Sequence, residues 1–161
     1  MKSLVLALAV ALVATAAPAA ELLLGAGHSR YGSDRGRDSA VISAELRGAP
    51  FAQFAGAGVS AAVAADLHGR GDAFVGIGLA ARWALGADWF IDTSVLPGLY
   101  SASGSANDLG GNFQFRSALA LGRRFDGVGA VSLAVVHKSN AGIDSFNPGM
   151  NALLLRWHRE F

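Results

Sequence analysis

Residues 75–83, VGIGLAARW, carry apolar side chains at the odd-numbered positions and glycine, alanine or arginine at the even-numbered ones. Side chains two apart on an extended chain share a face, so this period predicts a β-strand with one apolar face. Stronger and weaker forms of the same pattern recur along the chain. Eight strands are therefore expected, at residues 22–29, 39–47, 58–63, 75–83, 89–95, 112–122, 129–140 and 150–161.

An even number of alternating segments of about ten residues is typical of a transmembrane β-barrel, whose closure pairs every backbone group that lipid cannot solvate. A soluble β-sandwich also alternates, but the polar face of these segments would make a poor core for one. In a small barrel, charged groups can pair with one another inside while the apolar face meets lipid. The predicted fold is thus an all-β, eight-stranded antiparallel transmembrane β-barrel. Its expected inward polar side chains are Arg82, Asp92, Gln114, Arg116, Lys138, Arg156, His158 and Glu160.

The connections between the expected strands alternate in length. Short turns are predicted near residues 48–50, 86–88 and 126–128, and longer connections near 30–38, 67–72, 101–110 and 141–149. In outer-membrane barrels the short turns face the periplasm and the long loops face outside. The seventh strand is therefore expected to run outward and to end near the outer membrane boundary. Aromatic residues near strand ends are candidates for the interfacial girdles, namely Trp83, Trp89, Phe113, Trp157 and Phe161.

The N-terminus has Lys2, an apolar run from Leu4 to Val13 and small residues up to Ala19. This order predicts a secretory signal peptide over residues 1–19, which leaves residues 20–161 as one outer-membrane barrel domain. After that segment, the chain has no run of about 20 apolar residues that could span a membrane as a helix.

The composition argues against several classes of function. The chain has 13 Lys and Arg residues against 12 Asp and Glu residues, so no charge excess indicates nucleic acid as a partner. It has no cysteine, so no disulfide holds the exported chain together. His28, His68 and His158 do not form a spaced ligand set, so no metal site is expected.

The stretch HKSNAG, residues 137–142, contains a hydroxyl two residues from an imidazole in an expected strand. A neighbouring imidazole can take the hydroxyl proton of Ser139, so this serine is a candidate nucleophile. Asn151 is expected opposite His137 across the last hairpin, on the same outward face. A lipid embedded in the membrane would reach such a site by lateral diffusion. His137 and Ser139 are both expected to face lipid, because they continue the series of apolar side chains at every second position, Val131, Leu133 and Val135.

This stretch resembles the signature region of PagL-type lipid A 3-O-deacylases, outer-membrane enzymes of Gram-negative bacteria. The resemblance implies location in the cell outer membrane, lipid A or lipopolysaccharide as the substrate, and hydrolysis of the ester-linked acyl chain at the 3 position without metal or cofactor. It also implies that Ser139 is the nucleophile and His137 the general base, with hydrogen-bond donors to the oxyanion from Asn140, Ala141 and Gly142. The signal peptide, size and strand pattern agree over the whole chain, and the specific matches are His137, Ser139, Asn140, Ala141, Gly142, Asn147 and Gly149.

One position departs from the family pattern, which places a glutamate where this chain has Asn151. An asparagine oxygen can accept a hydrogen bond from the imidazole and fix its tautomer, but it lacks the charge that stabilises the imidazolium. Loss of the acid in a Ser-His-Asp system can lower turnover by about four orders of magnitude. Asp144, in the adjacent loop, is an alternative partner for the imidazole, whereas Glu160 lies on the wrong face by phase.

Two other functions stay open at this point. One is a small non-enzymatic barrel that stabilises the membrane or binds a partner through its long loops. The other is an esterase that acts on phospholipid or another acyl ester. The sequence also leaves open whether two copies associate as a homodimer.

Overall fold

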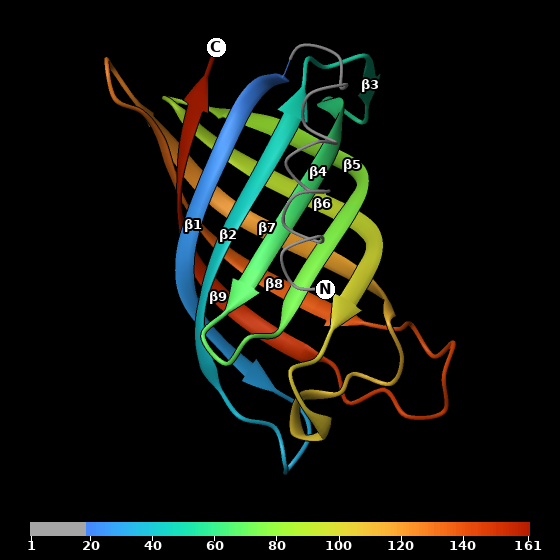
Figure 1. The fold of residues 1–161 in the computed structure, drawn as a ribbon. Helices are drawn as coiled ribbons and strands as arrows, with labels where there is room; N and C mark the ends of the chain where they lie inside the picture. The colour runs from blue at the N-terminus through green and yellow to red at the C-terminus, as the bar shows by residue number, and fades with distance from the viewer. Residues whose placement is uncertain (1–18) are drawn as a thin grey trace.

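The computed structural model describes residues 19–161, so all of the predicted signal peptide except Ala19 lies outside the described residues. One antiparallel sheet contains the strands of this part of the chain (Figure 1). They are β1 Ala19–Tyr31, β2 Ser39–Gly48, β3 Ala52–Phe54, β4 Ala57–His68, β5 Ala73–Gly86, β6 Trp89–Ser101, β7 Phe113–Phe125, β8 Gly129–Ser139 and β9 Met150–Glu160.

The sheet closes into a barrel of eight strands. β2 pairs with β1 and β4, each later strand up to β9 pairs with the next one in the chain, and β9 closes the ring by pairing with β1. The short strand β3 pairs only with β4 and lies outside the ring. The predicted eight-stranded antiparallel barrel is therefore confirmed. No helix among residues 19–161 has the length and apolar character needed to cross a membrane.

Charged side chains fill the barrel interior, as the alternation predicts. Asp66 is 1% exposed, and its Oδ2 lies 2.7 Å from Lys138 Nζ and 2.9 Å from Arg116 Nε. A second group of ion pairs surrounds Asp92, whose Oδ1 lies 3.1 Å from Arg47 Nη1. These pairs satisfy charges that would otherwise be buried alone. The predicted inward set is confirmed except at the rim, where Glu160 is exposed and pairs with Arg124. The acidic partners Glu21, Glu45 and Asp66 were not in the predicted set.

The outward face is apolar. Ile77, Leu119 and Leu155 are each about 60% exposed, so the barrel presents a band that water would not stabilise. Four of the five predicted interfacial aromatics lie exposed on or just beyond this face, namely Trp89, Phe113, Trp157 and Phe161. The fifth, Trp83, is half-buried and donates a hydrogen bond to the carbonyl of Ala55.

The long connections gather at one end of the barrel and the tight turns at the other (Figure 1). Two predicted turns are confirmed, after Gly86 and after Phe125. The turn predicted at 48–50 is wrong, because the chain runs on into a small hairpin formed by β3 and the start of β4. The connection predicted at 67–72 is shorter than expected, because β4 continues to His68. The buried ring of His68 lies within hydrogen-bond distance of Ser29 Oγ through Nδ1 and of Lys138 Nζ through Nε2.

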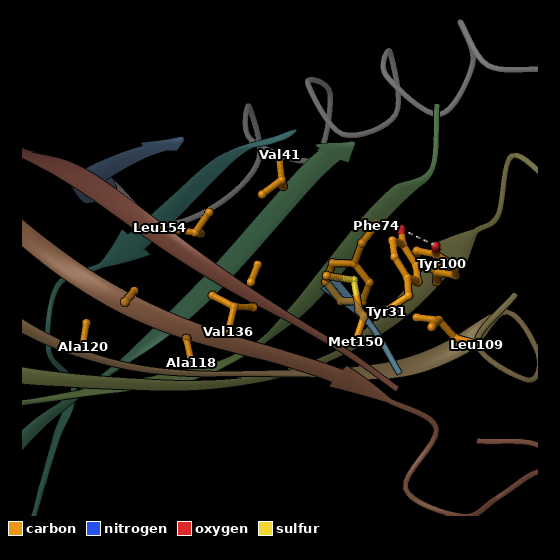
Figure 2. Close-up of a cluster of buried hydrophobic side chains, with 12 residues drawn as sticks. Tyr31, Val41, Phe74, Tyr100, Leu109, Ala118, Ala120, Val136, Met150 and Leu154 are labelled. Atoms are coloured by element: carbon orange, nitrogen blue, oxygen red, sulfur yellow. Dashed lines mark hydrogen bonds between the residues drawn. The ribbon is translucent and has the colours of Figure 1, made fainter. Parts of the chain in front are cut away.

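A cluster of buried side chains lies beneath the long connections. Tyr31, Phe74, Tyr100, Leu109 and Met150 come together there, and the two tyrosine hydroxyl oxygens lie 3.1 Å apart (Figure 2). This cluster closes the loop end of the interior and supports the segment in which β8 ends.

Candidate functional site

β8 carries His137 and Ser139 on its outward face. Leu133 and Val135 are each 55% exposed, His137 continues the exposed phase, and Ser139 is half-buried at the strand end. Lys138, between them, points inward and is 1% exposed. The predicted lipid-facing orientation of the imidazole and the hydroxyl is therefore confirmed.

Asn151 of β9 lies directly opposite His137, which confirms the predicted register. Its Oδ1 is 2.9 Å from His137 Nδ1. A carboxamide oxygen only accepts hydrogen bonds, so this contact places the ring proton on Nδ1 and leaves Nε2 as an acceptor. A neutral imidazole held in this way presents the nitrogen that a general base requires.

Gly149 makes room for the imidazole. Its φ is +64°, in the left-handed region that glycine adopts without strain. A β-carbon at this position would stand 3.1 Å from His137 Cε1 and 3.7 Å from Nε2. The imidazole of His137 therefore packs against the backbone of Gly149, the residue just before β9.

The hydroxyl and the imidazole are neighbours without a direct hydrogen bond between them in this structure of residues 19–161. Two positions along a strand separate Cα atoms by about 6.5 Å, so the side chains of His137 and Ser139 lie within reach of each other. Hydrogen bonds between catalytic groups are often long or absent until substrate binds. The arrangement is therefore compatible with proton transfer from the hydroxyl to Nε2.

The backbone amides after Ser139 differ in what they bind. The Asn140 amide donates to Asn147 Oδ1 at 3.2 Å, and the Gly142 amide donates to Asn140 Oδ1 at 2.9 Å. No acceptor within residues 19–161 takes the amide of Ala141, whose φ is +55°. Of the three predicted oxyanion donors, the Ala141 amide is thus the one free to bind a substrate oxygen.

Asp144, the alternative partner for the imidazole, and Glu160, which was expected on the other face, both lie away from His137. The Asp144 carboxylate lies beside Gly111 in the β6–β7 connection, and within the described residues no hydrogen bond joins it to His137. Glu160 lies at the opposite end of β9 and pairs with Arg124. Asn151 is therefore the side chain that orients the imidazole in this structure.

Two further polar side chains flank the site on its outward row. Arg30 of β1 lies opposite Asn151, and Ser117 of β7 lies opposite His137. Neither residue was predicted at this place, because the alternating pattern alone sets no register for these two strand pairs. Arg30 is exposed, and a guanidinium at this position suits a lipid phosphate.

A second serine, histidine and carboxylate lie in line inside the barrel. Ser132 Oγ is 2.7 Å from His158 Nε2, and His158 Nδ1 is 3.1 Å from Glu21 Oε1. Ser132 and His158 are at most 2% exposed. A cavity of about 520 Å³ at the tight-turn end is lined by Glu21 but by neither of these two residues. A substrate would therefore not reach this serine, and we assign the trio to the polar interior.

The part of the chain that the structure describes contains no group of three or more His, Cys, Asp or Glu residues that could hold a metal ion. The outward site is accordingly described by its own side chains and backbone.

Comparison with known proteins gave two findings and one negative result. The family model described as lipid A 3-O-deacylase (PagL) matches residues 45–160. A solved structure described as the crystal structure of the outer membrane enzyme PagL superposes with a TM-score of 0.68 at 18% sequence identity, covering 88% of this chain and 100% of that one. At 18% identity, this structural similarity shows the fold alone. No curated protein sequence matched the chain.

Proposed function

The chain belongs to the lipid A 3-O-deacylase (PagL) family, and on that premise we propose that His137 and Ser139 carry out the family reaction on the lipid-facing surface of the barrel. The protein is an outer-membrane ester hydrolase, and it removes the acyl chain linked by an ester at the 3 position of lipid A. One observation supports the choice of residues: on the exposed outward face of β8, His137 Nδ1 lies 2.9 Å from Asn151 Oδ1.

The first half of the reaction is acyl transfer to the enzyme. Ser139 Oγ attacks the carbonyl carbon of the ester while His137 Nε2 takes the hydroxyl proton. The carbonyl oxygen becomes an oxyanion, which accepts a hydrogen bond from the Ala141 amide. When the tetrahedral intermediate collapses, the bond to the sugar oxygen breaks, and His137 returns the proton to that oxygen.

The second half is hydrolysis of the acyl-serine. A water molecule attacks the acyl carbonyl while His137 takes its proton. When this second intermediate collapses, the bond to Ser139 Oγ breaks, His137 returns the proton to Oγ, and a fatty acid is released. The site opens toward lipid, so the substrate reaches it within the membrane. Water and the sugar headgroup reach it from the boundary at which β8 ends.

Alanine variants at the pair test this assignment. We expect Ser139→Ala and His137→Ala to leave the mass of lipid A unchanged, whereas the wild-type protein in detergent removes one hydroxyacyl chain. The matched control is Ser132→Ala, which removes the interior serine of the same strand. If Ser139→Ala is active and Ser132→Ala is not, the catalytic serine is Ser132, inside the barrel. A wild-type protein without activity would favour the non-enzymatic barrel, and loss of phospholipid mass instead would favour the other esterase.

We also propose that residues 1–19 are a signal peptide that is removed on export, so that the mature barrel domain comprises residues 20–161. The order of charged, apolar and small residues supports this proposal. The mass of the protein purified from outer membranes measures the cleavage position. A homodimer stays a prediction, and chemical crosslinking in native membranes measures it.

A further inference from the structure

Four polar side chains form a buried cluster under the long connections, which we call the polar latch: Tyr31, Asp72, Tyr100 and Asn107 (Figure 2 shows its two tyrosines). Asp72 Oδ2 accepts hydrogen bonds from Tyr31 Oη at 2.8 Å and from Asn107 Nδ2 at 2.6 Å. Tyr100 Oη donates to the Asn107 carbonyl at 3.0 Å. All four residues are at most 6% exposed, so these bonds are made away from bulk water.

The latch ties the β6–β7 connection, residues 102–112, to two other connections. Asp72 belongs to the β4–β5 connection, and its Oδ1 accepts the backbone amide of Ser103 at 2.7 Å. Asn107 Oδ1 accepts the backbone amide of Arg37, in the β1–β2 connection, at 2.8 Å. Asn107 is thus the residue through which three connections share one hydrogen-bonded arrangement.

The connection held by the latch contacts the segment that follows the candidate nucleophile. The carbonyls of Leu109 and Gly110 accept hydrogen bonds from Asn140 Nδ2 at 3.3 and 2.8 Å. Gly110 has a φ of +79°, and a β-carbon there would overlap the Phe146 carbonyl. The two connections are therefore in direct backbone contact, and a shift of one displaces the other.

Asn140 transmits this contact to the oxyanion donor. Its side chain is fully buried, and its Oδ1 accepts the amide of Gly142 at 2.9 Å. This bond closes the turn around Ala141, whose φ of +55° is unusual for a residue other than glycine. The orientation of the Ala141 amide thus depends on where Asn140 is held.

From this chain of contacts we infer that Asp72 and Asn107 are positioning residues of the reaction: they hold the β6–β7 connection in the place from which it fixes Asn140 and aims the Ala141 amide at the substrate oxyanion. The inference rests on the proposed function of Ser139. It links the three other long connections to turnover through hydrogen bonds that end at the segment following Ser139. A donor displaced by about 1 Å can cost about a hundredfold in rate.

Variants at Asn107 test the inference in the full-length barrel, with lipid A as the substrate. Asn107→Ala removes the bonds to Asp72 and Arg37, and Asn107→Asp sets two carboxylates against each other. We expect kcat to fall about tenfold or more in both, with KM within about twofold, because the lost interaction acts in the transition state. The double variant Asp72→Asn/Asn107→Asp restores a donor and an acceptor, so its kcat should return to within about threefold of the wild type.

Three controls separate the outcomes. Activity is expressed per folded barrel, measured by the heat-dependent shift of the barrel in gel electrophoresis, so a purely structural role lowers the folded fraction and leaves kcat unchanged. Arg70→Ala, at an exposed neighbour of Asp72, should keep wild-type kcat and KM. The inference is overturned if Asn107→Ala keeps the wild-type kcat or if the double variant does not recover. The proposed function still stands in that case, provided that Ser139→Ala is inactive. Activity in Ser139→Ala overturns the proposed function itself.

Discussion

His137 Nδ1 and Asn151 Oδ1 lie 2.9 Å apart, so a neutral side chain orients the imidazole of the candidate site. The contact fixes the tautomer, and it leaves Nε2 free to accept the proton of Ser139. It supplies no negative charge to the imidazolium that forms during attack. Asn151 therefore orients the imidazole as an acid would, but it stabilises the imidazolium less than an acid would.

Asn151→Asp should raise kcat. The two side chains have the same shape, so the substitution adds a charge at the oxygen that already contacts Nδ1. Replacing the acid of a Ser-His-Asp triad by its amide costs about four orders of magnitude, and we expect the reverse change to recover at least about tenfold of this. Mass spectrometry of lipid A under single-turnover conditions measures the rate.

Asn151→Ala is the companion variant. It removes the oxygen that holds Nδ1, so kcat should fall below that of the wild type by about tenfold or more. If the alanine and aspartate variants both turn over lipid A at the wild-type rate, Asn151 does not orient the catalytic base.

Gly149→Ala should lower kcat by about ten- to a hundredfold. The new β-carbon would meet His137 Cε1 at 3.1 Å, so the imidazole has to shift from the position in which Asn151 holds it. Gly127→Ala is the control, because Gly127 has a similar φ of +73° in the β7–β8 turn and nothing within 4 Å of its β-carbon position. Both variants carry the same backbone strain, and only the first should change kcat. Equal loss in the two would assign the effect to strain.

Much of the barrel could be predicted because each strand has one face in lipid and one in a charged interior. The alternation in residues 75–83 and 112–122 reports that contrast directly. β3 was missed because all three of its residues are exposed and show no alternation. Its turn uses Ala55 at a φ of +47°, a conformation that the sequence gives no reason to expect from alanine.

The facing of His137, Ser139 and Asn151 could be predicted because phase carries along a strand and across a hairpin. The support of the following loop could not. Asn140 binds the backbone carbonyls of Leu109 and Gly110, some 30 residues earlier, and a carbonyl has no side-chain signature. Contacts of this kind follow from how connections fold over the barrel end.

The contribution of Asp72 to stability should disappear in acid. Burial alone would raise the pKa of Asp72, but hydrogen bonds from Ser103, Asn107 and Tyr31 outweigh it, so the pKa lies below its ordinary value. The folded state therefore binds this proton less readily than the unfolded state. The stabilisation is fully present above the unfolded pKa, about 3.9, and is lost as the pH falls through the lower folded value.

Urea unfolding of the wild type and of Asp72→Asn in detergent measures this difference. We expect the wild type to be more stable by about 1–3 kcal/mol at pH 7 and at pH 5, and the gap to narrow as the pH falls below about 3.9. The difference between the two proteins removes the effect of the other carboxylates. A gap that is independent of pH would show that the Asp72 charge does not stabilise the latch.

Asp66→Asn should be among the most destabilising single changes in the barrel. Asp66 is buried between Lys138 and Arg116, so the variant leaves two cations in the interior with one counter-charge removed. Breaking a buried ion pair from one side costs about 3–5 kcal/mol. Lys138→Met should cost clearly less, because it leaves Asp66 paired with Arg116 and replaces the ammonium by an apolar group of similar length. Urea unfolding from lipid vesicles measures the free energy of unfolding of both variants.

Lys138 lies between His137 and Ser139 in the chain, so the kcat of a folded Lys138→Met barrel is also informative. A wild-type kcat would show that the interior charge network supports the barrel wall and takes no part in the chemistry outside it.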